Sequence, residues 1–438
     1  MSDKTSLTSE PASGPVQASS PTYLRSVLKV LGGSATAQAI PILMMLLLTR
    51  LVSVDILGVF AIWQSVIYIA LVLATARMDI LLVSLPHPAD RLLAFRIGMS
   101  SSLLVGGLLS LLAATATGFI QTKLPGWDLS ASLLLGLGVC ALAMQTLWLA
   151  RAIATGAFGT LNRIRITSAG LTALLQMVLL WYHPSAMMLM LGFVIGTSCG
   201  SLAGWSSLTR RQDGSQPDAP PHDASLSAPA TDYRDLLRQH GRTPMIALPA
   251  ALINTIAQQI PLMLTGVRFG EEAAGFLGIA WRTISAPMSI ISNSALDVFK
   301  KSATDEYNET GQCRSAYLQT LRLLAFLAIF PSLILFIWGP SLFAIAFGEQ
   351  YRTAGEITQI FAPLLYLRFF ASPLGYTFLI VRRPKVELWW QIGLLFMSLA
   401  VFVIPQTAMT AFKAFSAGYA SMYVIYLILQ WQAANARR

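Results

Sequence analysis

Residues 56–86 read ILGVFAIWQSVIYIALVLATARMDILLVSLP, an apolar stretch whose only charged residues are Arg77 and Asp79. The stretch is longer than the roughly 20 residues that an α-helix needs to cross a bilayer. The rest of the chain is similar, because 55% of its 438 residues are hydrophobic, 11% are charged, and the mean hydropathy is +0.62. A soluble domain carries about 25% charged residues. The sequence therefore predicts an integral membrane protein.

The other apolar runs are also long, which favours transmembrane helices over a β-barrel, whose strands alternate over roughly 10 residues. Apolar runs bounded by proline, glycine and charge predict an all-α membrane protein with about twelve transmembrane helices. The expected spans are 25–49, 56–84, 94–119, 131–151, 163–182, 186–208, 243–266, 273–299, 318–338, 356–381, 387–404 and 411–432.

A polar segment divides these spans into six and six. Residues 210–238, which begin RRQDGSQPDAPPHDASLSAPATDYRD, carry too few apolar side chains to bury and are predicted to form a cytoplasmic linker. The equal split predicts an N-lobe (24–209) and a C-lobe (239–438), two six-helix lobes around a central cavity. Residues 1–23 lack the apolar core of a signal peptide and are expected to be a disordered cytoplasmic tail.

The basic residues are distributed unevenly over the predicted loops. With the N-terminus placed in the cytoplasm, most of the 30 Lys and Arg fall in the loops on the cytoplasmic side. The positive-inside rule therefore predicts that both termini are cytoplasmic. The net charge of +10 then reflects topology and contact with the lipid bilayer, and no nucleic-acid partner is expected.

Several classes of site are not supported by the sequence. Three cysteines imply no disulfide framework, and none of the four histidines has a second His or Cys at metal-ligand spacing. We find no catalytic nucleophile, phosphate-binding glycine loop or ATPase motif. We therefore expect no enzyme activity, no metal and no cofactor.

Ionisable residues within a membrane usually face a bundle interior or a watery cavity, so Arg77 and Asp79 are candidate functional residues. In a continuous helix they lie about 200° apart, and we expect no simple salt bridge between them. Asp79 is predicted to face a cavity, and Arg77 to reach a neighbouring helix or the headgroups. Alternatively, both side chains lie at the cytoplasmic end and extend to water.

The eighth expected span carries the clearest polar stripe. One helical face holds Arg282, Ser285, Ser289 and Asn293, with Asp297 at its edge. A single serine can bond its own backbone, but this does not explain an arginine deep in a span that is aligned with an asparagine. The stripe predicts a hydrophilic cavity, and Trp281 beside it is a candidate for ring stacking.

Other spans repeat this pattern. Asn254 and Gln258 share a face of the seventh span, and Arg368 aligns with Ser372 in the tenth. Arg282 and Arg368 each precede a proline by five residues, in RTISAP and RFFASP, and a proline kinks its helix. Kinked helices beside a cavity are typical of a transporter that moves.

The sixth expected span contains a different feature, a stripe of small residues. One face carries Gly192, Gly196, Gly200 and Gly204. Such a stripe predicts close packing against another helix, either within the chain or between protomers.

The cavity residues indicate the chemistry of a substrate. Guanidinium groups bind phosphate bidentately, and amide side chains bind sugar hydroxyls. A cavity with arginine, asparagine, glutamine and serine therefore suits an anionic substrate that is rich in hydroxyl groups.

Four stretches resemble the polysaccharide/O-antigen flippases of the Wzx type, which belong to the multidrug/oligosaccharidyl-lipid/polysaccharide exporter superfamily. LTRLVSVDILGVFAIW (48–63) is similar to the first loop of that family, and ARMDILLVSLP (76–86) to its Arg-aromatic-acid run. The most specific match is QQIPLMLTGVRFGEEAAGFLGIAWRTISAPMSIISNSALDVF (258–299), and FGEQYRTAGEITQIFAPLLYLRFFASPLG (347–375) resembles the entry to the tenth span. The order of these stretches carries the resemblance.

The resemblance implies a transporter of the bacterial inner membrane that moves a polyprenyl-pyrophosphate-linked oligosaccharide to the periplasmic leaflet by alternating access. Its expected partners are this lipid-linked substrate, the bilayer and the machinery that polymerises the glycan. The candidate substrate-binding residues are Arg282, Arg368, Arg77, Asn254, Gln258, Ser289 and Asn293. Asp79 and Asp297 are the candidate coupling residues.

Three alternative functions make different predictions for the sequence. A cation-coupled drug antiporter of the same superfamily predicts carboxylates rather than arginines in the cavity. A membrane enzyme that builds polysaccharide would need a large extramembrane loop with paired carboxylates or a metal site. A purely structural membrane protein would not need an arginine stripe deep in a span.

Overall fold

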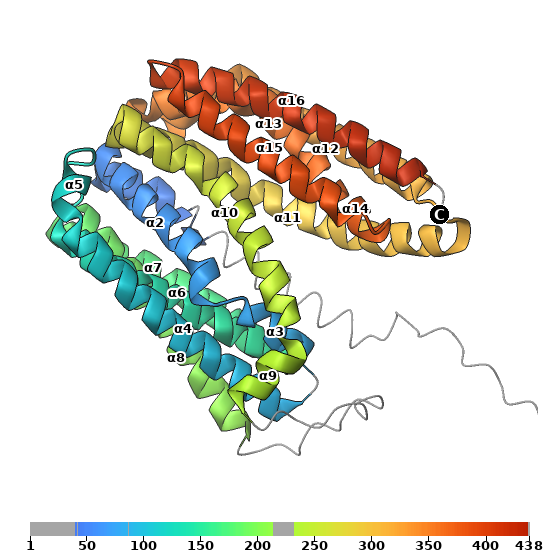
Figure 1. Ribbon diagram of the computed structural model, residues 1–438. Coiled ribbons are helices and arrows are strands. Elements are labelled where there is room, and N and C mark those ends of the chain that lie inside the picture. Colours follow the sequence, from blue (N-terminus) through green and yellow to red (C-terminus); the bar gives the residue numbers. More distant parts are fainter. Residues whose placement is uncertain (1–39, 42, 86, 213–231, 437–438) are drawn as a thin grey trace, which may run out of the picture.

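The computed structural model describes residues 40–41, 43–85, 87–212 and 232–436, and this part of the chain is helical throughout (Figure 1). Ten of its helices are long and apolar enough to cross a membrane. The all-α prediction is confirmed.

The helices follow one another with short connections. In the first half of the chain they are α2 (Val54–Ala74), α3 (Met78–Ser84), α4 (Pro88–Thr115), α5 (Thr117–Gln121), α6 (Leu129–Ala154), α7 (Phe158–Tyr182) and α8 (Ala186–Gln212). The second half contains α9 (Tyr233–His240), α10 (Arg242–Phe269), α11 (Glu271–Thr310), α12 (Arg314–Phe347), the 3-10 helix η1 (Glu349–Tyr351), α13 (Arg352–Leu374), α14 (Thr377–Ile380), α15 (Pro384–Val403) and α16 (Ala408–Asn435).

The ten candidate spans coincide with ten of the twelve expected ones. The eighth expected span lies in α11, which runs for 40 residues and is therefore about 60 Å long at 1.5 Å per residue. Such a helix is longer than a bilayer is thick. The first expected span, 25–49, lies mostly outside the described residues.

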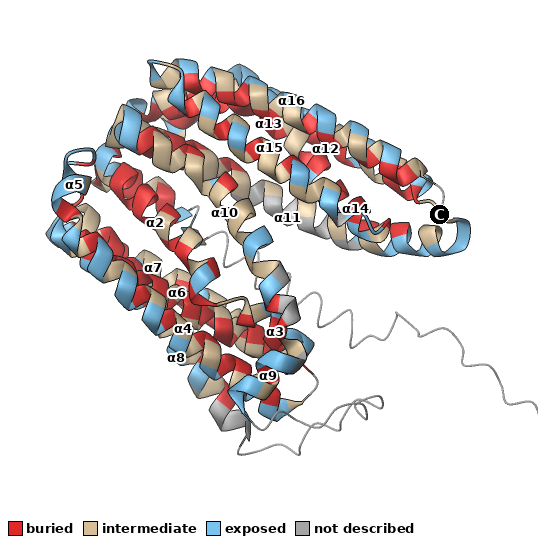
Figure 2. Ribbon diagram, viewed as in Figure 1, coloured by how far each residue is buried: buried red, intermediate tan, exposed pale blue. Residues whose placement is uncertain are grey.

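The helices form two groups, which Figure 1 shows as α2–α8 on one side and α11–α16 on the other. Within the first group α7 packs along α8 and α4 along α6, and within the second α12 packs along α13. α2 packs against both α10 and α11, so these three helices join the groups. Figure 2 shows buried residues on the facing sides of the helices and exposed residues on their outer sides.

The outer sides are apolar where lipid would surround them. Leu104 on α4 is 72% exposed, and Phe326 and Phe330 on α12 are 74% and 73% exposed. Large apolar patches on a water-soluble surface are rare, whereas a bilayer accommodates them without cost.

The expected helix over 56–84 is interrupted, which corrects the prediction for the charged pair. Ala76 and Arg77 have positive φ angles of 46° and 57°, so α2 ends at Ala74 and α3 begins at Met78. The break invalidates the 200° separation, and Arg77 Nη1 lies 3.8 Å from Asp79 Oδ2 as an ion pair. Arg77 Nε and Asp79 Oδ1 are buried without a hydrogen-bond partner among the described residues.

The glycine stripe on α8 packs against α7 of the same chain. A Cβ added at Gly196 would lie 2.3–2.5 Å from atoms of Thr172, and one at Gly200 would lie 2.6 Å from Ser168 Cβ. The predicted close packing is therefore confirmed as a contact within the chain. This contact brings the backbones of α7 and α8 close together and sets the rotation of α7 about its own axis.

The two groups meet at one end of the molecule, which we call the closed end and define by Val52, Gly58, Gly126, Glu271 and Tyr351. Glu271 Oε1 accepts a hydrogen bond from the backbone N–H of Gly126 at 2.6 Å, and the Tyr351 hydroxyl donates to the carbonyl oxygen of Val52 at 3.2 Å. Each bond joins the first half of the chain to the second.

Glycines allow the helices to approach at this end. A Cβ at Gly58 would lie 1.8 Å from the carbonyl oxygen of Glu271, and one at Gly275 would lie 2.1 Å from that of Val54. Burial raises the pKa of the Glu271 carboxyl, the N–H of Gly126 opposes this shift, and Asp55 adds to it.

From the closed end the groups diverge toward the opposite end of the molecule (Figure 1). We call this the wide end; it contains α3, α9, α14 and the C-terminal end of α16.

Candidate functional site

A cavity of about 700 Å³ lies between the two groups of helices. Its wall comes from residues 41–48 and from α2, α6, α7 and α8 of the first half, and from α10, α11 and α16 of the second. This volume is in the range of pockets that hold small molecules or parts of larger ligands.

The charged lining residues of the cavity are both arginines, Arg165 and Arg282. The described lining contains no Asp or Glu. Two guanidinium groups and no carboxylate make this a cationic cavity, because arginine stays protonated in proteins.

Arg282 lies on α11 and reaches across to the first half of the chain. Its Nη2 donates a hydrogen bond to Gln64 Oε1 on α2, and its Cζ lies 5.7 Å from the ring centroid of Phe60. It forms no ion pair with a described carboxylate. Gln64 is neutral, so Arg282 keeps its full charge for a ligand, and the predicted place of Arg282 in a cavity is where the structure puts it.

Arg165 on α7 supplies the second guanidinium group; it falls at the start of the expected span 163–182 and was not among the predicted site residues. It belongs to a stripe of lining residues at helical spacing, formed by Arg165, Ser168, Thr172 and Gln176. The glycine stripe of α8 packs on this same side of α7, since Gly196 and Gly200 lie against Thr172 and Ser168. The recurrence of polar residues every three or four positions was the signal that could have identified it.

Amide and hydroxyl groups occupy much of the remaining wall. Gln258 lines the cavity, and its Nε2 donates to Asn254 Oδ1 one turn earlier at 3.0 Å, so Asn254 orients a lining residue from outside the wall. The other polar lining residues are Gln64, Ser65, Tyr68, Gln145, Thr197, Gln259, Trp281, Thr283 and Ser285. These groups can donate to and accept from sugar hydroxyls.

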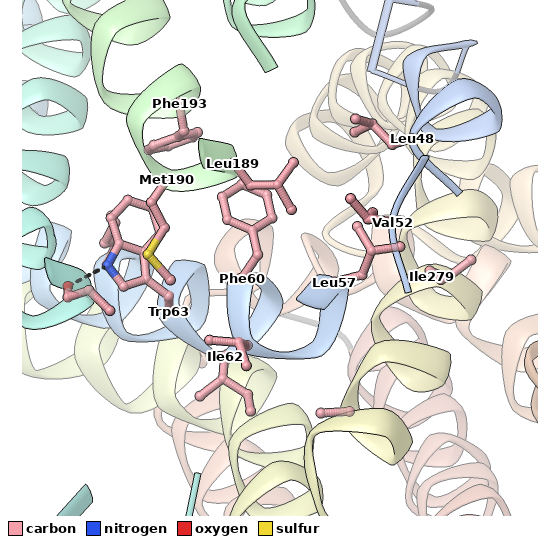
Figure 3. Packing of buried hydrophobic residues seen from close by; sticks show 14 of the residues in the cluster. Leu48, Val52, Leu57, Phe60, Ile62, Trp63, Leu189, Met190, Phe193 and Ile279 are labelled. Atoms are coloured by element: carbon pink, nitrogen blue, oxygen red, sulfur yellow. Dashed lines mark hydrogen bonds between the residues drawn. The ribbon is translucent and has the colours of Figure 1, made fainter. Parts of the chain in front are cut away.

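One side of the cavity is apolar. Figure 3 shows Leu48, Phe60 and Phe193 in the cluster that forms this side, with Trp63 beside them. The rings of Phe60 and Phe193 meet edge to face with centroids 6.4 Å apart, and Trp63 Nε1 donates to the carbonyl oxygen of Ala131. The cavity is therefore amphipathic.

Arg368 lies behind the cavity wall. Its Cζ is 4.9 Å from the ring centroid of Trp281, and Trp281 itself lines the cavity. Tyr419 and Tyr423 of α16 also lie near enough to Arg368 to interact with its charge. Trp281 thus contacts Arg368 and also lines the cavity, so its stacking on a substrate ring stays a prediction.

Two further predicted site residues, Arg77 and Asp79, are not part of the described lining. Arg77 and Asp79 pair with each other at the break between α2 and α3, near the wide end. The side chains of Ser289, Asn293 and Asp297 lie outside the described residues.

A family model described as "Polysaccharide biosynthesis protein" matches residues 47–356 of this chain. The matched region includes α2 to α12 and every cavity arginine. The chain belongs to this family.

One curated relative of this polysaccharide biosynthesis protein is the teichuronic acid biosynthesis protein TuaB of Bacillus subtilis (strain 168). The two are 29% identical over 191 residues, which are 42% of this chain and 38% of the relative. The chain thus spans less than two fifths of the length of that relative.

Two solved structures show the fold of the family member. The lipid II flippase MurJ in an inward closed conformation matches with a TM-score of 0.66 and 11% identity, over 93% of this chain and 87% of that one. An inward-facing multidrug resistance MATE family transporter of the MOP superfamily matches with a TM-score of 0.59 and 12% identity, over 92% and 94%. The chain therefore has the MOP superfamily fold.

Proposed function

We propose that this protein moves a polyprenyl-pyrophosphate-linked oligosaccharide from the cytoplasmic to the periplasmic leaflet of a bacterial inner membrane by alternating access. The observation that carries the proposal is the cationic cavity, with Arg282 from one half, Arg165 from the other and no carboxylate in its described lining. Membership of the polysaccharide biosynthesis family supports a glycan substrate.

Different parts of the substrate would contact different surfaces of the cavity. The diphosphate would lie between Arg165 and Arg282, because guanidinium groups bind phosphate oxygens with two parallel hydrogen bonds. The sugars would contact the amides, among them Gln258 and Gln259. The polyprenyl chain would pass the apolar side at Leu48 and Phe193 and remain in lipid.

The arrangement of the ends supports a direction of access. The halves meet at the closed end and diverge at the wide end, where the basic α9 and the C-terminal end of α16 lie. By the positive-inside rule the wide end would be cytoplasmic. The structure then corresponds to a state that is ready to accept substrate from the cytoplasmic leaflet.

The membrane potential would assist export. A negative charge that moves outward across an inside-negative membrane gains about 2.3 kcal/mol per 100 mV. A doubly charged diphosphate would therefore gain roughly 4 to 5 kcal/mol per 100 mV. This contribution reduces the need for a dedicated coupling ion, including one at Asp79.

The antiporter alternative is less well supported. Expulsion of a cationic drug calls for acidic groups in the binding cavity, and the described lining has only basic ones. The likeness to a multidrug transporter concerns the fold, at 12% identity.

The proposal is tested by deletion of the gene and by reconstitution. The deletion strain should accumulate undecaprenyl-linked oligosaccharide on the cytoplasmic face, and purified protein in vesicles should move a fluorescent lipid-diphosphate-linked glycan between leaflets. A deletion strain with normal surface glycan, together with inactive vesicles, would refute the function.

A further inference from the structure

The short helix α9 (Tyr233–His240) is not used by the proposed transport cycle, and the sequence reasoning placed most of it in a linker. Asp232 caps its N-terminus by accepting a hydrogen bond from the backbone N–H of Tyr233 at 2.7 Å. α9 contacts α4 and α10. It is therefore a docked element of the fold.

Leu236 attaches α9 to the first half of the chain. It is 0% exposed and belongs to a cluster that also contains Leu85, Phe95, Ala152 and Ala157. Ala152 and Ala157 lie where candidate membrane spans end or begin, since α6 ends at Ala154 and α7 begins at Phe158, and Leu85 directly follows the short helix α3. The ends of spanning helices mark the membrane boundary, so α9 lies at that boundary.

The face of α9 opposite Leu236 is exposed. It carries Arg234 and Arg238, one turn apart, and beside them Tyr233 and Leu237, which are 44% and 46% exposed. Two arginines with an aromatic and an aliphatic residue on one face are typical of helices that lie in the headgroup region. Arginine side chains there can place their charge among phosphates while their stems cover apolar surface.

The surroundings of α9 are also basic. Arg96 on α4 is exposed close to Phe95, which shares the cluster with Leu236. Arg91 is occupied differently, because its guanidinium donates to the carbonyl oxygens of Leu85 and Ala154 at the ends of α3 and α6. An exposed face with two arginines, a tyrosine and a leucine is complementary to a surface of anionic headgroups.

We propose that α9 is a membrane-surface helix whose Arg234 and Arg238 bind the phosphates of anionic phospholipids at the wide end of the molecule. Gly241 connects α9 directly to α10, whose Gln258 and Gln259 line the cavity. Lipid binding would hold the first turns of α10 at the membrane surface. This proposal concerns bulk lipid and does not depend on which substrate is transported.

The experiment uses the full chain with its three cysteines replaced by alanine and a bimane fluorophore on Leu237→Cys. The protein is reconstituted into phosphatidylcholine vesicles that contain a few per cent of a lipid with a nitroxide on its headgroup. That lipid is either phosphatidylglycerol or phosphatidylcholine. We expect both to quench bimane, and the phosphatidylglycerol label to quench about threefold more strongly at low salt.

In the R234Q/R238Q variant, the two nitroxide-labelled lipids should quench bimane to the same extent. The R50Q/K413Q variant is the matched control, since it loses the same number of charges from exposed residues at the closed end, and should retain the preference. Gel filtration checks that each variant is folded. Absence of headgroup quenching, or a preference that survives R234Q/R238Q, would overturn the proposal.

Discussion

Arg282 and Arg368 have the same local sequence context and different surroundings. Each precedes a proline by five residues inside a helix of the second half. Arg282 lies in the wall of the cavity and bonds Gln64 across the halves. Arg368 lies behind that wall, stacked on Trp281.

The difference follows from the neighbours of each helix. α11 packs against α2 of the other half, whereas α13 packs against α12, α16 and α11 within its own half. An arginine on α11 can therefore face the space between the halves, but one on α13 is surrounded by aromatic rings of its own half, among them Tyr419 and Tyr423. An intramembrane arginine thus indicates a polar environment without telling whether that environment is a ligand site.

The largest expected effect separates these two roles at Arg282. Arg282→Ala should abolish export and weaken binding of the diphosphate-linked substrate by about 10- to 100-fold, because a charge-assisted hydrogen-bond pair is lost. Arg282→Lys should be partly active, because lysine keeps the charge without the bidentate geometry. Binding and export are measured with equal amounts of membrane-inserted protein. Full activity of Arg282→Ala would remove it from the site.

Arg165 extends the comparison to the first half. Arg165→Ala should weaken binding of a lipid diphosphate by roughly tenfold and binding of a lipid monophosphate much less, since a monophosphate can be held by Arg282 alone. Arg163→Ala is the matched control, because Arg163 is exposed on the same helix and donates to Ser207 Oγ. Equal effects of the two substitutions on diphosphate binding would show that Arg165 acts only through the charge of that helix.

At Arg368 we expect a loss of stability rather than of affinity. Arg368→Met should lower the free energy of unfolding by about 1 to 2 kcal/mol, because the cation–π contact with Trp281 is lost. The substrate affinity of the folded fraction should change less than twofold. Thermal unfolding in detergent and a binding titration measure the two quantities. A large affinity loss without destabilisation would mean that Arg368 contacts the substrate.

The smallest effect is expected for a change in the polar linker. Deletion of residues 213–230 should leave export within about twofold of the intact protein, since this stretch carries too few apolar side chains to bury. Surface glycan measured in the deletion strain complemented with this variant tests it. Complete loss of export would assign the linker a function that neither arginine explains.

The general architecture could be predicted from the sequence because hydropathy and the distribution of basic residues both depend on the bilayer. The break between α2 and α3 could not, since Thr75, Ala76 and Arg77 include no proline or glycine and nothing local marks a helix end. With that break unrecognised, the geometry assigned to the pair Arg77 and Asp79 was wrong.

The candidate site was predicted in part, for reasons that differ by residue. Arg282 and Gln258 were found because periodicity places them on polar faces within their spans. Arg165 was missed because a basic residue near the end of a span is typical of the membrane boundary, although it shares a polar stripe with Thr172 and Gln176. The position of Arg368 depends on rings from α16, which no local pattern encodes.

The contact of Gly58 with Glu271 and of Gly275 with Val54 has a consequence for the proposed alternating access. Two helix backbones that are in direct contact, with no side chains between them, can separate easily. No side-chain rotamers have to be repacked when the helices come together again. A methyl group at Gly58 or Gly275 would keep the two backbones apart. The two glycines are therefore expected to matter for the proposed transport, although neither belongs to the described cavity lining.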